Sequence, residues 1–568
     1  MASTSSKSWR IISRPILETV LNNHVQHHRV HQPLILHGPR GVGKTTLILE
    51  RLMENWNKGP HITGYVDFAH SIKEHHPSQC ESFPWSSWNA ATESPPPLSL
   101  LRTHLEKCLE SLAERGIVLG QITSSQIFTL LNKWHGLSNA LRFILEKSNS
   151  GSLKKGGALS KVSASVLWER AVFAYSGKWD GKDNEGLAGL KGMNVEERSY
   201  LKEAVMALRL AKEVIRVQQQ WRSNAIADLN RNGGFSRSLM ISATDWPGLL
   251  LELLSSASEI DHFQPKLVLN NIEVLKNAIT NDDSTVCAPT YHDSLIWRII
   301  SLGANEMCLP VIIMTSDSYY SYRAYIDFGF PDIFISRETF GWTPNEGKLH
   351  MVPDYFSASE WTIITEVLGA NSRHLFELHA LKESDRYLNM MGHISNTFED
   401  IMDAYLAYFQ ITVVNPSMDK ALSLLQKFSL DAYNGKIPKD RLRFGAPWRH
   451  PPHTDDPIHH LEWAKIQLMD FVQSLVNAEF GLNYFADCSL EIFDDPSAVA
   501  LLEVGVLYAQ RDPSFIRPVS RGMQRCLVRW LVQEQLQMNW LTSLRFTWHR
   551  LFRGRYYRHL LLQTGYKY

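Results

Sequence analysis

The residues best suited to chemistry lie close together near the start of the chain: Gly38, Pro39, Arg40, Gly41, Val42, Gly43, Lys44 and Thr45. They match the pattern GxxxxGK[ST] at every position. Glycines at these positions let the backbone curl so that successive N–H groups point inward and can hold an anion. The lysine of this pattern reaches the β- and γ-phosphates of a nucleotide, and the hydroxyl that follows it binds Mg²⁺. We therefore predict a site for a nucleoside triphosphate with Mg²⁺, in which Lys44 contacts phosphate, Thr45 contacts the metal and Thr46 adjoins the nucleotide.

The segments on either side of this loop have the patterns that a phosphate site requires. Apolar residues 33–37 precede it as a short strand, and residues 46–56 follow it with apolar side chains at helical spacing. Such a helix turns its positive N-terminal end toward the phosphates. A further strand is predicted at 62–68, so the domain begins strand, helix, strand, which implies a parallel sheet with a right-handed crossover.

Two more strands are predicted far downstream, at 266–270 (KLVLN) and 310–315 (PVIIMT). Their nearly continuous apolar character suits parallel strands that are covered on both faces. Between 68 and 266 the chain holds amphipathic helices, of which the strongest runs from Val195 to about Asn230. It also holds Gly-, Ser- and Lys-rich stretches that cannot support a packed core. The sheet domain is therefore expected to contain a large helical insertion.

Four motifs together resemble the STAND branch of AAA+-like ATPases, and most of all its archaeal-type ATPases. They are GPRGVGKTTL (38–47), YVDF (65–68), PVIIMTSDS (310–318) and GANSRHL (369–375). The resemblance implies a short helix before the phosphate loop, a sensor strand that ends in a small polar residue, and a winged helix beyond a helical lid. It also implies that the nucleotide is ATP. Arg373 matches the position of a lid arginine that contacts nucleotide, although a surface arginine at the start of a helix would give the same pattern.

The sequence departs from this family where two acids should end the Walker B strand. Aligning KLVLNNIE with that strand places Asn270 and Asn271 at the positions of the metal-holding Asp and the catalytic Glu. An amide has no negative charge and is not a base, so it can replace neither group. Glu273 could substitute as the catalytic acid if the backbone turns sharply. We therefore expect nucleotide binding with weak or absent hydrolysis.

Three other polar residues are candidates through the same resemblance. Ser316 ends the sensor strand, where a hydroxyl can hydrogen-bond the γ-phosphate or the attacking water. Arg323 and Arg337 are possible arginine fingers for a neighbouring subunit. Polar residues are common in any turn after a strand, and arginines are common on surfaces, so these assignments stay hypotheses.

Composition limits the class of protein. The 568 residues include 58 Lys plus Arg and 58 Asp plus Glu, so the whole-chain charge predicts neither nucleic acid nor an anionic membrane as partner. The six cysteines have no zinc-ligand spacing and are interpreted as reduced core thiols. No apolar stretch is long enough to cross a bilayer. We expect an intracellular protein, cytoplasmic or nuclear; the acid-free first 17 residues leave a mitochondrial or plastid location as the alternative.

The C-terminal end has a composition of its own. Residues 535–568 contain no aspartate or glutamate. In this segment arginines are interleaved with tryptophan, phenylalanine and tyrosine. Basic and aromatic residues together suit phosphate contacts with base stacking, or an amphipathic helix on a membrane surface. A helix that packs its aromatic face on the preceding domain explains the pattern equally well. Nucleic acid is thus a possible partner through this tail, and a protein partner or self-association is expected from the large helical fraction.

The predicted fold is α/β, with a parallel-sheet P-loop NTPase core of AAA+/STAND type, a helical insertion, a helical lid and a winged-helix-like region. The segments are a tail (1–15), the first part of the NTPase domain (16–70), the insertion (71–263), the second part of the NTPase domain (264–355), the lid (356–440), the winged-helix-like region (441–530) and the basic aromatic tail (531–568). We expect a nucleotide-dependent switch or scaffold. The alternatives are an active ATPase that remodels protein or nucleic acid, and a nucleic-acid-binding ATPase that uses the winged helix.

Overall fold

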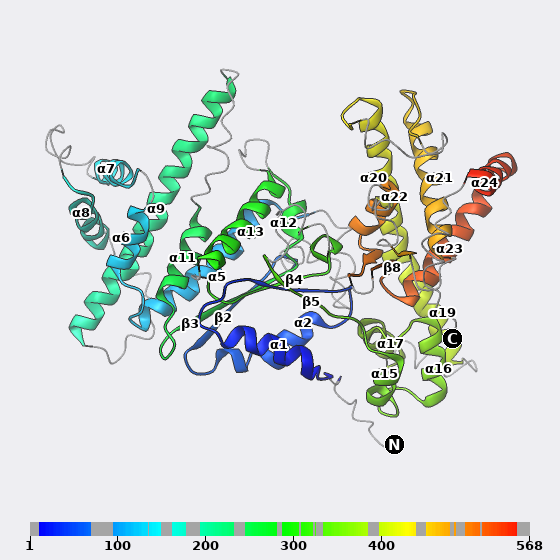
Figure 1. Cartoon of the computed structure of the whole chain (residues 1–568), viewed down its shortest axis with the longest axis horizontal. Coiled ribbons are helices and arrows are strands. Elements are labelled where there is room, and N and C mark those ends of the chain that lie inside the picture. The colour runs from blue at the N-terminus through cyan, green and yellow to red at the C-terminus, as the bar shows by residue number, and fades with distance from the viewer. Residues whose placement is uncertain are drawn as a thin grey trace.

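The computed structural model of the chain is a mostly helical α/β protein with one parallel sheet at its centre (Figure 1). It describes residues 9, 11–69, 95–133, 136–148, 162–177, 194–231, 245–280, 287–305, 308–321, 324, 333–383, 397–438, 450–476, 482–483, 495–511 and 514–553. The predicted parallel sheet is confirmed: five strands lie in the order β2-β3-β4-β1-β5, and every neighbouring pair is parallel. The strands are β1 (Leu34–His37), β2 (His61–Asp67), β3 (Gln264–Asn270), β4 (Val311–Thr315) and β5 (Ile335–Glu338).

Four of these strands were predicted within two residues, and β5 was not. Every residue of β1, β3 and β4 is buried, as expected for the apolar run in each strand. The edge strand β5 has the sequence ISRE, and its residues are partly or fully exposed. It pairs with β1 from Leu34↔Ile335 to His37↔Glu338. Backbone hydrogen bonds to β1, rather than apolar burial, therefore define β5 as a strand.

One face of the sheet is covered by the helices that flank the phosphate loop (Figure 1). Alternate strand residues point to this face, so Leu34, Leu36 and Ile312 share a core with Leu21 and Trp56. The helix that follows the loop begins as an α-helix and continues with π-helical hydrogen bonding. The elements here are α1 (Pro15–Gln26), α2 (Lys44–Leu47), the π-helix η1 (Ile48–Leu52) and the 3-10 helix η2 (Asn55–Asn57).

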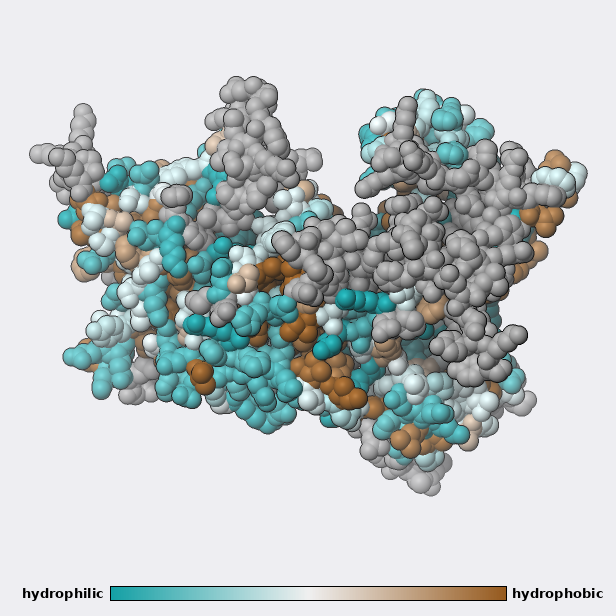
Figure 2. All heavy atoms as spheres, viewed as in Figure 1, coloured by the Kyte–Doolittle hydropathy of each residue, from teal (hydrophilic) through white to brown (hydrophobic). Residues whose placement is uncertain are grey.

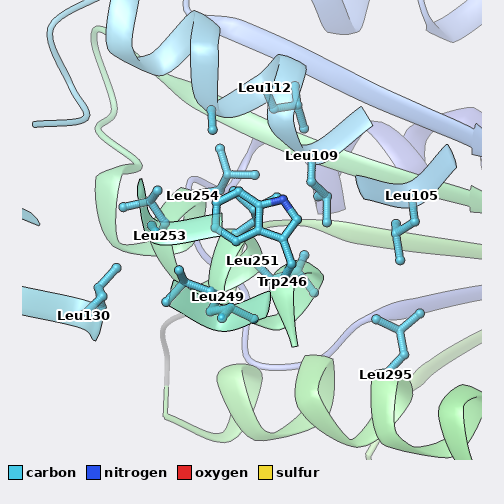
Figure 3. Close-up of a cluster of buried hydrophobic side chains, with 14 of the residues drawn as sticks. Leu105, Leu109, Leu112, Leu130, Trp246, Leu249, Leu251, Leu253, Leu254 and Leu295 are labelled. Carbon is cyan, nitrogen blue, oxygen red and sulfur yellow. The ribbon is translucent and has the colours of Figure 1, made fainter. Parts of the chain in front are cut away.

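The other face of the sheet carries the predicted insertion, whose described residues are helical. Trp246 lies among leucines of its own helix α11 and of the neighbouring helix α5, including Leu105, Leu109 and Leu112 (Figure 3). This leucine cluster is continuous with the buried residues of β3 and β4, so it fixes the insertion to the sheet. The helices of the insertion are α5 (Leu98–Val118), α6 (Ser124–Asn132), α7 (Leu137–Ser148), α8 (Ala164–Gly177), α9 (Val195–Arg231) and α11 (Trp246–Ala257). Two helices that follow β3, α12 (Val274–Asn277) and α13 (Ala288–Ala304), pack in the same hydrophobic core.

Residues beyond β5 form a separate, mainly helical part with a core of its own, at the right of Figure 1. A short helix and two antiparallel strands follow one another near Leu501, as predicted, and the residues at the tip of that hairpin, 512 and 513, lie outside the described ranges. A third short strand completes this small sheet in the order β6-β8-β7. The elements are α15 (Pro344–Met351), α16 (Ala358–Val367), α17 (Ser372–Lys382), α19 (Phe398–Phe409), the π-helix η6 (Gln410–Val414), α20 (Asn415–Tyr433), α21 (Pro457–Val476), β6 (Leu482–Asn483), α22 (Pro496–Glu503), β7 (Leu507–Ala509), β8 (Phe515–Pro518), α23 (Arg521–Gln537) and α24 (Trp540–Arg553).

The boundary that we predicted at residue 530 falls inside a helix. Buried residues recur at helical spacing along α23 from Met523 to Leu531, so the chain has no linker there. The following helix α24 carries exposed apolar side chains, and hydrophobic residues are visible in its region at the upper right of Figure 2. Among the described residues, no helix has the length and apolar character needed to cross a membrane.

Candidate functional site

The predicted site residues meet beyond the carboxyl ends of three neighbouring strands. The phosphate loop follows β1, Ser316 follows β4, and Asn270 ends β3. The helix after β1 lies on one face of the sheet, whereas the helices after β3 lie on the opposite face (Figure 1). Ligands of open parallel sheets bind beyond strands whose connections leave to opposite faces. The topology therefore puts the loop where such a sheet holds its ligand.

The glycines of the loop are required by both conformation and space. Gly41 and Gly43 have φ angles of 81° and 90°, a region that side chains disfavour. A Cβ atom on Gly38 would lie 2.1 Å from the carbonyl oxygen of Thr339, and one on Gly41 would lie 2.6 Å from Oδ1 of Asn371. The loop is thus held closely by the segment after β5 and by the start of α17.

Lys44 lies at the centre of the loop and is buried. Its Nζ donates hydrogen bonds to the carbonyl oxygens of Gly38 and Pro39, at 2.8 and 3.0 Å, and to Oγ of Ser316 at 3.0 Å. Burial lowers the pKa of Lys44 to about 7; the Glu273 carboxylate opposes this shift, and nearby arginines add to it. The ammonium group is therefore surrounded by oxygens yet easily deprotonated.

The lowered pKa of Lys44 predicts that phosphate binding depends on pH. A protonated Lys44 attracts phosphate, and a bound polyphosphate raises its pKa, so binding takes up a proton once the pH exceeds about 7. Affinity for Mg-ATP should then fall by up to about tenfold per pH unit above that value. Calorimetry in buffers of different ionisation enthalpy measures the uptake, and Lys44→Arg, which stays charged, is the control. Constant affinity from about pH 7 to about pH 9 would contradict this assignment.

Glu273 reaches the end of β4, although it lies two residues past the expected acid position. The backbone turns sharply at Asn271, which has a φ angle of 55°. Oε2 of Glu273 accepts a hydrogen bond from the hydroxyl of Thr315 at 2.8 Å, and Oε1 accepts one from the backbone N–H of Ser316 at 3.3 Å. Burial and the nearby Asp317 carboxylate raise the pKa of Glu273. The carboxylate thus contacts the same residue, Ser316, that contacts Lys44.

The two asparagines bind a carboxylate that the sequence analysis did not select. Nδ2 of Asn270 donates to Oδ2 of Asp67 at 3.1 Å and to the hydroxyl of Tyr65 at 2.9 Å, and it lies 3.4 Å from Oγ1 of Thr45. Nδ2 of Asn271 donates to Oδ1 of Asp67 at 2.7 Å. Asp67 ends β2 beside Asn270 of β3. Its place at the end of a neighbouring strand is a signal that could have identified it.

The start of α17 contacts the phosphate loop directly. The backbone N–H of Arg373 and the hydroxyl of Ser372 both donate to the carbonyl oxygen of Gly41, at 3.1 and 2.6 Å. The side chain of Asn371 donates to the carbonyl oxygen of Arg40 at 3.2 Å and accepts from the N–H groups at the start of the helix. The structure therefore brings Arg373 to the loop, and its guanidinium donates to Glu377 at 2.6 Å.

The small C-terminal sheet is joined to the end of β1 through buried polar groups. Nδ1 of His37 lies 2.8 Å from the hydroxyl of Tyr508 in β7, which donates to Glu338 at 2.9 Å. Burial lowers the pKa of His37 to about 3, so the ring is neutral. Because the Tyr508 hydroxyl donates its one hydrogen to Glu338, it accepts a hydrogen bond from Nδ1 of His37. Gly505 lies against the guanidinium of Arg40. Two elements of the C-terminal part, α17 and the segment around β7, thus reach the phosphate loop.

The remaining predicted residues lie farther from these contacts. Thr46 is exposed on α2, and Arg337 is exposed on the edge strand β5. Arg323 lies outside the described residues. The described part of the chain holds no group of three or more His, Cys, Asp or Glu side chains that could hold a metal ion by themselves. No protein-family model matches the chain, and no curated protein matches its sequence.

Proposed function

We propose that this chain is an ATP-binding P-loop protein of STAND/AAA+ type, and that it acts as a nucleotide-dependent switch or scaffold. The observation that carries the proposal is the placement of Lys44, Thr45 and Ser316 at one edge of a parallel sheet, on a loop with the complete GxxxxGK[ST] pattern. Lys44 and the loop N–H groups bind the phosphates, and the Thr45 hydroxyl binds Mg²⁺. The preference for ATP rests on the family resemblance.

The switching part of the proposal rests on the contacts between α17 and the loop. Gly41 accepts two hydrogen bonds from the start of α17, and Lys44 is bonded to carbonyl oxygens of the same loop. Phosphates that draw Lys44 away from these carbonyls alter the loop on which α17 is docked. The lid and the winged-helix-like region share one hydrophobic core, so they respond to that change together.

The switch predicts that Mg-ATP changes the protection of α17 from hydrogen exchange. We expect the amide of Arg373 and the following turn to exchange at a rate that differs by at least about tenfold between the free and the ATP-bound chain, because an opening free energy that shifts by ~1.4 kcal/mol changes exchange tenfold. Ser372→Ala should reduce this difference, because it removes one hydrogen bond to Gly41. Helix α13, which lies on the other side of the sheet, is the internal reference.

Unchanged exchange in α17, observed while ATP binding is intact, would contradict the switch. It would leave nucleotide binding itself untouched, because binding is measured independently in the same samples. Equal changes in α13 and α17 would also contradict the proposal, since they would report a general stabilisation by ligand rather than a response of the lid.

A second candidate function, ATP hydrolysis, is favoured by the position of Glu273. The turn at Asn271 brings this carboxylate to Thr315 and Ser316, next to Lys44. Burial and the nearby carboxylate of Asp317 raise its pKa, which makes it a better base than an ordinary glutamate when it is ionised. In this function Glu273 accepts the proton of the attacking water, and Ser316 hydrogen-bonds the γ-phosphate.

The proposed partner is another protein or a second copy of the chain. On α24, Trp540, Leu544 and Trp548 are exposed by 63% or more of their surface. Arg550 of the same helix is bound to the buried carboxylate of Asp470, so it is used within the chain. These features fit an apolar contact better than phosphate binding, and nucleic acid remains the alternative for the tail.

A further inference from the structure

A carboxylate on β2 and the hydroxyl proposed to bind the metal, that of Thr45, both lie beside the side-chain nitrogen of Asn270. The resemblance does not expect a metal-site acid on β2. Asp67 ends β2 and pairs with Asn270, the last residue of β3. One nitrogen, Nδ2 of Asn270, lies 3.1 Å from Oδ2 of Asp67 and 3.4 Å from Oγ1 of Thr45. Asp67 and Thr45 are both partly exposed, whereas Asn270 is buried. The buried amide therefore lies between the side chains of two partly exposed residues.

The two oxygens of Asp67 have different surroundings. Oδ1 accepts hydrogen bonds from Nδ2 of Asn271 at 2.7 Å and from the backbone N–H of Ala69 at 3.0 Å. These bonds fix the orientation of the carboxylate. Oδ2 accepts from the side chain of Asn270, which is also the group that approaches Thr45. One oxygen thus holds the side chain in place, and the other lies on the side of the phosphate loop.

The residues at this edge suit Mg²⁺, although Asn270 and Asn271 have replaced the expected acids. Mg²⁺ keeps several of its waters and is commonly held by one or two carboxylates together with phosphate oxygens. Thr45 supplies the hydroxyl of the phosphate loop, and Asp67 supplies one carboxylate. Asn270 presents an N–H donor toward Thr45, and a donor cannot bind a cation. A metal at this place needs a negative charge nearby. Among the described contacts of Asn270 and Thr45, the one acidic side chain is that of Asp67 on β2.

We propose that Asp67 is the metal-site carboxylate of this chain, and that its Oδ2 holds the hydration shell of Mg²⁺ bound at Thr45. Asn270 and Asn271 position Asp67 by donating to its two oxygens. This inference rests on the proposed nucleotide-binding function. It transfers the role of the missing acid on β3 to the neighbouring strand β2, one strand farther from the phosphate loop.

The test compares ATP affinity with Mg²⁺ and with a chelator, for the full chain and Asp67→Asn. The wild type should bind ATP more tightly with Mg²⁺, and Asp67→Asn should reduce this gain by about 10- to 100-fold, the usual effect of removing an outer-shell partner of a metal. Affinity without Mg²⁺ should stay within about twofold, because in this proposal Asp67 acts only through the metal. Mn²⁺ electron paramagnetic resonance with ATP gives a second readout that needs no turnover. Asp261→Asn, an exposed aspartate before β3, is the control.

A swap variant separates a metal role from a structural one. Asp67→Asn combined with Asn270→Asp returns a carboxylate to β3, and the Mg²⁺-dependent gain in affinity should recover. Asp67→Asn that keeps the full gain, or a swap that leaves it lost while ATP still binds, would overturn the inference. Equal losses of affinity with and without Mg²⁺ would overturn it as well, because they report a structural role. A wild type that binds no ATP under either condition would instead contradict the proposed function.

Discussion

Replacing Lys44 by alanine is expected to lower the affinity of the chain for Mg-ATP by about a hundredfold or more. The buried ammonium of Lys44 contacts three oxygens at the centre of the loop. In the proposed ATP-bound state, phosphate oxygens take the place of the two carbonyls. Hydrogen bonds to charged groups contribute ~1.5–3 kcal/mol each, so the loss of two corresponds to this change. Equilibrium titration with a fluorescent ATP analogue measures it.

The matched control for this variant is Lys58→Ala. Lys58 is an exposed lysine whose partners, Glu54 and Asn55, belong to the short helical turn before β2. Its replacement should leave the affinity for Mg-ATP unchanged within about twofold, because exposed ion pairs contribute ~0–1 kcal/mol. Equal affinities of wild type and Lys44→Ala, for two chains with the same melting temperature, would rule out Lys44 as a phosphate ligand.

Glu273→Gln is expected to lower the single-turnover rate of ATP hydrolysis by about a hundredfold or more, and to leave ATP affinity nearly unchanged. A general base contributes ~10²–10⁴-fold to the rate, and glutamine keeps the shape of the side chain but cannot accept a proton. The amide can still interact with Thr315 and Ser316, which bind Glu273 through a hydroxyl and a backbone N–H. Rapid-quench measurement with enzyme in excess over ATP gives the rate.

Glu259→Gln serves as the control for this variant, because Glu259 is exposed and lies before β3, away from the phosphate loop. Its turnover should equal that of the wild type. If Glu273→Gln and wild type hydrolyse ATP at the same measurable rate, Glu273 is not the base. If neither hydrolyses ATP although both bind it, the switch without hydrolysis is the correct description, and the amides at 270 and 271 explain it.

The central strands could be predicted because runs of apolar residues in the sequence indicate buried strands. Each of β1, β3 and β4 contains a run of at least three consecutive apolar residues that is buried on both faces, so a local pattern identifies them. The strand β5 could not be found in this way, because ISRE is polar and lies at the edge of the sheet. Its pairing depends on β1, about 300 residues earlier in the chain, and no local property of the sequence reports such a contact.

Residues 38–45 could be predicted as a phosphate loop from sequence alone because that chemistry requires fixed residue types at fixed spacing. From the sequence, Glu273 could replace the missing acid only if the backbone turned sharply. The structure has such a turn, which depends on a left-handed backbone conformation at Asn271. Asparagine adopts this conformation more readily than most residues, which gives a physical reason for an amide at this position. Asp67 was missed because its role depends on the strand order, which places the end of β2 beside the end of β3.

Contacts between distant segments were the least predictable part of the site. The hydrogen bonds from α17 to Gly41, and from His37 to Tyr508, join residues more than 300 positions apart. They depend on how the C-terminal core is docked against the sheet, and this is determined by packing rather than by a motif. The resemblance predicted Arg373 near the nucleotide, and its ion pair with Glu377 is by contrast a local one, because the two residues lie four positions apart on α17.

The central claim is that the loop from Gly38 to Thr45 binds a nucleoside triphosphate. It is tested most directly by calorimetric titration of the full chain with Mg-ATP, with Lys44→Ala titrated in parallel. The account predicts saturable binding of one ATP per chain, with a dissociation constant below about 1 mM in the wild type and an affinity weaker by about a hundredfold or more in the variant. Absence of saturable binding in a folded wild-type chain, or identical binding curves for the two chains, would contradict it.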